Sequence, residues 1–232
     1  MATLLDYAPL LGQGALVTIS LALLSLALAT ALGILGAWAK LSRWLIWNWL
    51  ASAYTSVVRG VPDLVLILLI YFGGQRLINQ IGSALDLPYL EISKFWAGVA
   101  AIGFMYGAYL TETFRGAYLS VPRGQSEAAE ALGLSRLATL WTVMTPQVVR
   151  LALPGYGNVW LVLVKSTAVV SVIGLQDLVG LADKAGKATR EPFLFFLAVI
   201  AVYLSITAAS GWALGRLGSR VNRGQEARGA WI

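Results

Sequence analysis

The sequence contains no cysteine and no histidine in its 232 residues. The absence of cysteine excludes disulfide frameworks and thiolate metal sites, and the absence of histidine excludes imidazole ligands and the commonest general base. Charge is also scarce, because only 12% of the residues are charged where about 25% is usual for soluble proteins. The eleven carboxylates are spread along the chain rather than gathered. A self-contained enzyme is therefore not expected.

Apolar residues make up most of the chain. They account for 58% of it, and the mean hydropathy is +0.74, which is typical of an integral membrane protein. The net charge of +6 would also suit nucleic acid binding. In so apolar a chain, basic residues are better explained as those of cytoplasmic loops, so no nucleic acid partner is expected.

Five stretches are apolar enough to supply the roughly 20 residues that a membrane-spanning helix needs. The first and last carry no charged residue, whereas ionisable residues interrupt or end the middle three. The first is not expected to be a cleaved signal peptide, since its apolar run is too long and no basic segment precedes it. The predicted spans are 14–39, 57–78, 95–117, 152–174 and 192–215.

The basic residues are unevenly divided between the two sides of the membrane. Five spans place eleven Lys and Arg residues on one side and five on the other, with Lys165 inside a span. The positive-inside rule assigns the richer side to the cytoplasm. The segment at 119–145 and the tail at 218–232 are therefore predicted to be cytoplasmic, and the amino terminus to be periplasmic.

A bend is predicted within the second hydrophobic stretch, at Arg59-Gly60-Val61-Pro62-Asp63. Pro62 removes a helical hydrogen bond and moves Val61 out of the helical conformation. The residues before the bend are expected to lie near the cytoplasmic interface, and the true span to follow it.

Ionisable residues in the middle spans are predicted to face the inside of the bundle or a water-filled path, because buried charge in lipid costs about 2.5 to 3.5 kcal/mol per residue. The two uncharged spans would then form an outer layer. Gly103, Gly107 and Thr111 recur every four residues, which indicates close helix packing. Glu112 and Arg115 are spaced to pair, either as a structural ion pair or as part of a gate or substrate path.

The fourth span combines helix-breaking and polar residues. Pro154, Gly155 and Gly157 predict an interrupted helix, which membranes tolerate where the backbone is buried or lines a cavity. Lys165 has two interpretations: it reaches the interface or a carbonyl group, or it holds a substrate carboxylate or a neighbouring Asp. The polar side chains that follow the glycines include Asn158, Trp160, Lys165 and Ser166.

The cytoplasmic segment 119–145 is predicted to form two short helices. Ser126 is expected to cap the first, Gly133 to end it in a left-handed turn, and Ser135 to cap the second. Such a hairpin is suited to docking into a groove on a soluble partner, although a solvated loop hairpin is the plain alternative.

Within that hairpin, Glu127-Ala128-Ala129, three residues, Gly133, nine residues and then Val143-Met144-Thr145-Pro146 resemble the EAA loop of ABC importer permeases. Val143 and Thr145 replace the Ile and Leu of the family pattern. Further segments resemble polar amino acid permeases in order and spacing, most of all the Q-type subunit of histidine and lysine-arginine-ornithine or opine importers. These segments are 58–65, 106–117, 153–158, 165–171 and 185–193.

The resemblance implies the five-helix permease fold of type I importers, as a multi-pass protein of the bacterial inner membrane. It implies a homologous M-type permease, two ATP-binding subunits and a periplasmic substrate-binding protein as partners. ATP and Mg would bind to the ATPase subunits and no cofactor to this chain, which moves polar, mainly basic, amino acids by alternating access. The contact with the ATPase is carried over to Glu127, Ala128, Ala129, Leu132, Gly133 and Leu134.

Substrate-path residues are less specifically indicated. Related permeases carry acids at positions that are Val159 and Ser166 here, so the resemblance leaves open whether this chain or its partner binds the substrate. An ion-coupled secondary transporter or channel, with Lys165, Asp63 and Glu112 as a relay, is the alternative class. The candidates for the path are Asp63, Glu112, Asn158, Trp160, Lys165 and Ser166.

Overall fold

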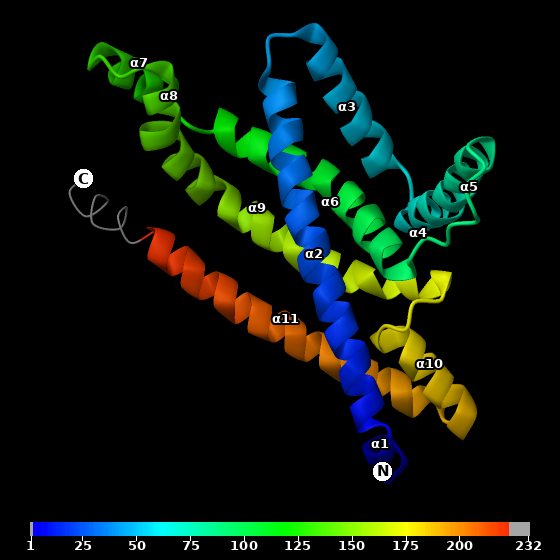
Figure 1. The fold of residues 1–232 in the computed structure, drawn as a ribbon. Helices are drawn as coiled ribbons and strands as arrows, with labels where there is room; N and C mark the ends of the chain where they lie inside the picture. The colour runs from blue at the N-terminus through cyan, green and yellow to red at the C-terminus, as the bar shows by residue number, and fades with distance from the viewer. Residues whose placement is uncertain (1, 223–232) are drawn as a thin grey trace.

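The computed structural model describes residues 2–222, and this part of the chain contains helices and no strand (Figure 1). Met1 and residues 223–232, which include most of the predicted tail, lie outside the described residues. The helices are α1 (Ala2–Asp6), α2 (Ala8–Leu41), α3 (Leu45–Gly60), α4 (Asp63–Leu68), α5 (Gly74–Ala84), α6 (Lys94–Leu119), α7 (Arg123–Ala131), α8 (Arg136–Ala138), α9 (Thr145–Ser166), α10 (Leu178–Thr189) and α11 (Pro192–Asn222). Short π-helical segments join α4 to α5 (Leu69–Gly73) and α8 to α9 (Thr139–Met144), and a 3₁₀ helix (Thr167–Ile173) follows α9.

Four helical segments in the described part of the chain are long and apolar enough to cross a membrane: Ala8–Leu41, Asp63–Ala84, Arg136–Ile173 and Pro192–Val221. They overlap four of the predicted spans. The predicted third span corresponds to α6, which has 26 residues but is rich in glycine, alanine and tyrosine and so less apolar. Instead, α6 carries more buried residues than any other described helix.

The most extensive helix packing in the described residues joins α2 to α6. A Cβ atom on Gly103 would lie 2.6 Å from Leu28 Cδ2, and one on Gly107 would lie 2.9 Å from Leu32 Cβ. Real Cβ atoms do not approach so closely, so the absence of side chains is what lets the helices touch. The predicted small-residue face is confirmed.

The first uncharged span buries one side of its helix against the rest of the chain. Its helix, α2, packs against α6 through a buried stripe with near-helical spacing, whereas α11 is largely exposed. The rest of the α2 surface is exposed or half-buried, as most of α11 is, so the prediction that the two uncharged spans form an outer layer stays a prediction. The buried stripe of α2 is Leu11, Gly14, Thr18, Leu21, Ala22, Ser25, Ala29, Gly33 and Ala37.

The predicted bend lies where the sequence places it. The α3 helix ends at Gly60, Val61 is extended with φ −105° and ψ 139°, and α4 begins at Asp63. The ring of Pro62 excludes the helical conformation for the residue before it, which ends α3 there.

The predicted interruption of the fourth span is wrong. The α9 helix continues through Pro154 from Thr145 to Ser166, and its glycines serve packing. A Cβ on Gly155 would lie 2.8 Å from Thr113 Cγ2 of α6. One proline removes a single hydrogen bond, which the rest of a 22-residue helix tolerates. The helix changes geometry later, in the 3₁₀ turns that lead to Gly174, whose φ is +81°.

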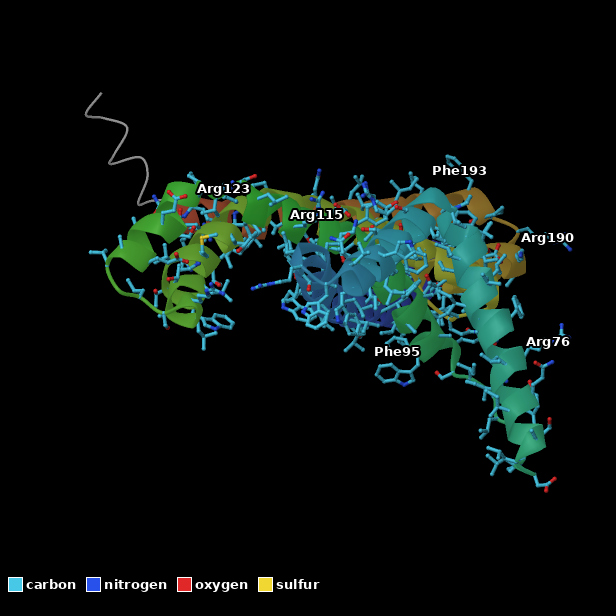
Figure 2. All side chains as sticks on the ribbon, turned by 90° about the horizontal axis from the view of Figure 1, so that it is seen from above. Arg76, Phe95, Arg115, Arg123, Arg190 and Phe193 are labelled. Atoms are coloured by element: carbon cyan, nitrogen blue, oxygen red, sulfur yellow. The ribbon has the colours of Figure 1, made fainter. Side chains whose placement is uncertain are left out.

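The connecting segments gather at two ends of the molecule. In Figure 1, α7 and α8 lie at the end towards which α11 runs, while the amino terminus, α5 and α10 lie at the other. Figure 2 shows the same separation from above, with Arg123 of α7 far from Arg76 of α5 and from Arg190. The helices between these ends hold the polar groups described next.

Candidate functional site

The α7–α8 hairpin projects from the end of the helical bundle (Figure 1). The α7 helix begins at Arg123, three residues before the predicted cap, so the prediction that Ser126 caps it is wrong. Ser126 Oγ instead donates a hydrogen bond to the Arg123 carbonyl, 2.8 Å away. Pro122 precedes the first turn, a place where a missing N–H costs nothing, and so starts the helix earlier.

The turn between α7 and α8 is built as the sequence predicts. Gly133 has φ +80°, and the N–H groups of Gly133 and Leu134 donate to the carbonyls of Glu130 and Ala129 at 2.9 and 3.1 Å. This paired arrangement closes a helix end around a left-handed residue. Ser135 Oγ accepts from the Ala138 N–H at 3.3 Å, which confirms the second predicted cap.

The predicted contact residues of the hairpin are mostly accessible. Glu127, Ala128 and Gly133 are exposed, Leu134 is half-buried, and Leu132 is 81% exposed. Ala129 is the exception, because it is buried at 4% exposure. The hairpin thus presents an acid and an apolar side chain outward, while Ala129 holds the hairpin together.

A cluster of hydroxyl groups surrounds the Asp63 carboxylate. Tyr106 Oη donates to Asp63 Oδ2 at 3.1 Å and Ser166 Oγ donates to the same oxygen at 3.3 Å. The two hydroxyl oxygens also lie 2.5 Å apart, so their two hydrogens are shared among the three contacts. The cluster joins α4, α6 and the end of α9, so it brings together two of the six substrate-path candidates and adds Tyr106. The sequence offered only a weak signal for Tyr106, a hydroxyl in an apolar span.

Glu112 binds two cations. Its Oε2 accepts from Arg115 Nε at 3.0 Å, as the spacing predicts, and its Oε1 pairs with Lys40 at the end of α2. The Lys40 and Glu112 side chains are only 12% and 21% exposed. Both carboxylate oxygens are therefore occupied, and the arrangement fastens α2 to α6 as a structural ion pair does. Lys40 was not predicted, because its partner is 72 residues away.

An open cleft of about 580 Å³ lies beside this ion pair, between α2, α3 and α6. Arg59 stands at its edge with its guanidinium carbon 5.3 Å from the centre of the Tyr109 ring. Tyr109 in turn stacks on Tyr106 at 5.6 Å between ring centres. The cleft is lined by Lys40, Thr55, Ser56, Arg59, Gly60, Tyr109 and Glu112.

The remaining three candidates lie apart from the Asp63 cluster. Asn158 and Lys165 are exposed on α9, and neither has a hydrogen-bond or ion-pair partner within residues 2–222. Lys165 therefore holds no neighbouring Asp in this chain. Trp160 is half-buried and packs against the core between α6 and α9.

Among residues 2–222 no group of three or more Asp or Glu side chains is placed to hold a metal ion. The hydroxyl, carboxylate and guanidinium groups described above can form hydrogen bonds and ion pairs with a small polar molecule.

Comparisons with known proteins identify the family of the chain. Residues 29–223 match the model of the family described as "Binding-protein-dependent transport system inner membrane component". The histidine/lysine/arginine/ornithine transport system permease protein HisQ of Salmonella typhimurium is 45% identical over 212 residues, which cover 91% of this chain and 93% of that protein. The arginine ABC transporter permease protein ArtQ of Escherichia coli is 38% identical over 92% of this chain and 95% of that protein.

Opine permeases and solved structures are similar as well. The nopaline transport system permease protein NocQ of Agrobacterium fabrum is 38% identical, and the alignment covers 92% of each chain. The crystal structure of an amino acid ABC transporter with histidines includes a chain with a TM-score of 0.83 and 32% identity, covering 94% of this chain and 97% of that one. A chain of the inward-facing MetNI methionine ABC transporter has a TM-score of 0.67 at 21% identity, which shows a shared fold.

Proposed function

Because the chain belongs to the family of binding-protein-dependent transport system inner membrane components, we propose that it is the Q-type permease subunit of an importer of polar, mainly basic, amino acids or opines. The observation that carries the substrate class is its identity with HisQ over nearly the whole of both chains. The names of ArtQ and NocQ extend the class to arginine and nopaline. The chain forms the path and does not hydrolyse ATP; ATPase subunits bind ATP and Mg.

In this proposal five helical segments cross the bacterial inner membrane, with α6 as the third. Its buried position supports this role, because neighbouring helices shield the less apolar surface of α6 from lipid. The amino terminus is periplasmic and the carboxyl terminus cytoplasmic. The positions of α7, α8 and the end of α11 opposite α5 and α10 support that topology (Figures 1 and 2).

The α7–α8 hairpin docks on an ATPase subunit through its exposed residues, chiefly Glu127, Ala128 and Leu132. A homologous M-type permease, two ATPases and a periplasmic binding protein complete the complex. ATP-driven closure of the ATPases moves the hairpins together and shifts the helices between outward and inward states. The two states must differ in contacts, and the hairpin is where ATP binding changes them.

The substrate path includes the Asp63 cluster. The Asp63 carboxylate binds the cationic group of the substrate. The hydroxyls of Tyr106 and Ser166 orient this carboxylate. Glu112 is bound on both oxygens and serves the scaffold. Asn158 and Lys165 lie on a face of α9 that this chain leaves uncovered, so the partner permease completes any path that uses them, with Trp160 supporting the helix behind.

Transport by the reconstituted complex tests the proposed function. Vesicles that contain both permeases and the ATPases, with ATP on the ATPase side and binding protein on the other, should accumulate labelled histidine, arginine, lysine, ornithine or an opine. Competition among these compounds ranks the preference of the transporter for each. Accumulation driven by an ion gradient through the permeases alone would instead support the secondary-transporter alternative.

The docking role gives a prediction for the hairpin. Gly133→Val should lower substrate-stimulated ATPase activity about 10-fold or more, because φ near +80° is strained for a β-branched side chain. Gly133→Asn should retain most of it, since Asn tolerates this conformation and a Cβ there meets nothing within 4 Å. Glu127→Lys should also uncouple transport from ATP hydrolysis.

The matched control for these variants is Gly124→Ala, in the same hairpin, where a Cβ also meets nothing within 4 Å. It should behave like the unaltered chain. Equal coupling in Gly133→Val and the control would count against docking through this turn.

A further inference from the structure

Two opposite charges flank the bend between α3 and α4 without pairing with each other. Arg59 precedes Gly60 and Pro62, and Asp63 follows them. No ion pair within residues 2–222 joins the two side chains or involves either of them. The extended backbone at Val61 separates the end of one helix from the start of the next. Each of the two charged side chains can therefore bind a separate partner.

The Arg59 and Asp63 side chains contact two neighbouring tyrosines of α6. The Arg59 guanidinium lies over the Tyr109 ring at 5.3 Å, and Asp63 accepts a hydrogen bond from Tyr106. The two rings stack at 5.6 Å between centres. Since Tyr106 and Tyr109 are three residues apart on one helix face, the cation and the anion are held along a single aromatic surface.

No carboxylate that lines the cleft is available to pair with Arg59. Glu112 is the acid among the residues that line the cleft, and Lys40 and Arg115 occupy both of its oxygens. The Arg59 side chain is exposed and has no hydrogen-bond acceptor among residues 2–222. A planar guanidinium with five donors binds both oxygens of a carboxylate or two oxygens of a phosphate at once.

We propose that Arg59 binds the carboxylate of the transported amino acid while Asp63 binds its cationic group. The inference rests on the proposed function and adds a residue, Arg59, that recognises the carboxylate common to all amino acids. Tyr109 positions the guanidinium and Tyr106 positions the Asp63 carboxylate. Arg59 and Tyr109 line the cleft of about 580 Å³, a volume within the range of small-molecule sites, and the Asp63 cluster adjoins it through the Tyr106 ring that stacks on Tyr109.

The test measures binding to the purified complex of both permeases and the ATPases without the binding protein, so that only sites within the complex contribute. Labelled arginine is displaced by unlabelled arginine or by agmatine, which is arginine without its carboxylate. The unaltered complex should prefer arginine. Arg59→Gln should weaken arginine binding about 10-fold to 100-fold, the usual value of a charge-assisted hydrogen bond, and leave agmatine binding unchanged.

Two further variants sharpen the test. Arg59→Lys keeps the charge and should lose part of the preference, because a lysine cannot grip both oxygens. Arg76→Gln removes an exposed arginine at α5 and should change neither ligand. Asp63→Asn should weaken arginine and agmatine alike, since both carry the cationic group.

Three results would overturn the inference. An equal fall of arginine and agmatine binding in Arg59→Gln would show a structural role for Arg59. A loss of co-purified phosphatidylglycerol, with the preference for arginine unchanged, would assign Arg59 to a lipid phosphate instead. Absence of arginine binding in the unaltered complex would remove the site, and ATP-driven uptake in vesicles would then still stand as the separate measure of the proposed function.

Discussion

At the scale of single residues, Glu112 keeps its charge inside the helical bundle because Lys40 and Arg115 meet its two carboxylate oxygens. Helical spacing predicts the contact with Arg115, which lies on the same face of α6. Spacing cannot predict the contact with Lys40, because that pairing depends on how α2 crosses α6.

Removal of this carboxylate should destabilise the protein. Glu112→Gln leaves Lys40, which is 12% exposed, and the more accessible Arg115 without an acid, and we expect a loss of about 1–3 kcal/mol in the free energy of unfolding. The thermal midpoint of the detergent-solubilised complex measures it. Asp183→Asn, which breaks the exposed pair with Lys187, is the matched control and should change stability by less than about 0.5 kcal/mol. Equal midpoints for both variants would contradict a structural role for Glu112.

Asp177 is a second buried carboxylate, outside the predicted spans. It caps α10 by accepting from the Gly180 N–H at 3.0 Å, and its Oδ2 has no hydrogen-bond partner among the described residues. Burial raises the pKa of Asp177 from 3.8 to about 6. The capping bond favours the charged form and is outweighed by the loss of solvent.

The raised pKa of Asp177 predicts a pH dependence of stability. The folded protein binds the proton more tightly than the unfolded chain, so this contribution is complete below about pH 4 and is lost as the pH rises through about 6. The loss is at most about 3 kcal/mol. Asp177→Asn keeps a capping oxygen and cannot ionise, so the difference in thermal midpoint between variant and parent should grow from pH 4 to pH 7. A difference that does not change with pH would contradict the assignment.

At the scale of helices, close packing of α2 on α6 depends on glycines whose regular spacing is evident in the sequence. Gly103→Ala should push Leu28 away and cost about 1–3 kcal/mol, the usual penalty for overpacking, seen as a lower thermal midpoint. Gly116→Ala, on the same helix with no atom within 4 Å of the added Cβ, should be neutral or stabilising. A Gly103→Ala variant as stable as Gly116→Ala would show that the helices are not in contact there.

Local signals predicted helix ends well where one residue decides them. Pro62, Gly133 and Ser135 act through their own backbone or side chain, and the structure confirms each. Ser126 failed as a cap because Pro122, four residues earlier, starts the helix first. Pro154 failed as a helix breaker because its neighbours in α9 are held by packing against α6 and α11.

At the scale of the whole molecule, the connecting segments divide between two ends of the bundle (Figure 1). Alkaline phosphatase fused after Leu87 or Thr189 should be active, since these segments are predicted to be periplasmic. A fluorescent protein fused after Ile232 should fluoresce in the cytoplasm, and phosphatase activity at that point would overturn the topology. The same fusion after Gly133 is the internal control for the cytoplasmic side.

The EAA pattern and the matching segments led to the permease family, and the family match and the identity to HisQ and ArtQ confirm that assignment. The membrane class followed from composition, since a chain with 12% charged residues cannot cover itself with polar surface. These features belong to the sequence because they depend on residue type and short spacing alone.

The tertiary structure alone decided which polar groups meet. Asp63, Tyr106 and Ser166 come from three helices, and Arg59 reaches Tyr109 across 50 positions of sequence. Such contacts depend on how helices cross, and many crossings satisfy the same apolar pattern. The sequence therefore determined that this chain is a membrane permease. The fold decided that Arg59 and Asp63 lie along one surface formed by Tyr109 and Tyr106, without an ion pair between them among residues 2–222.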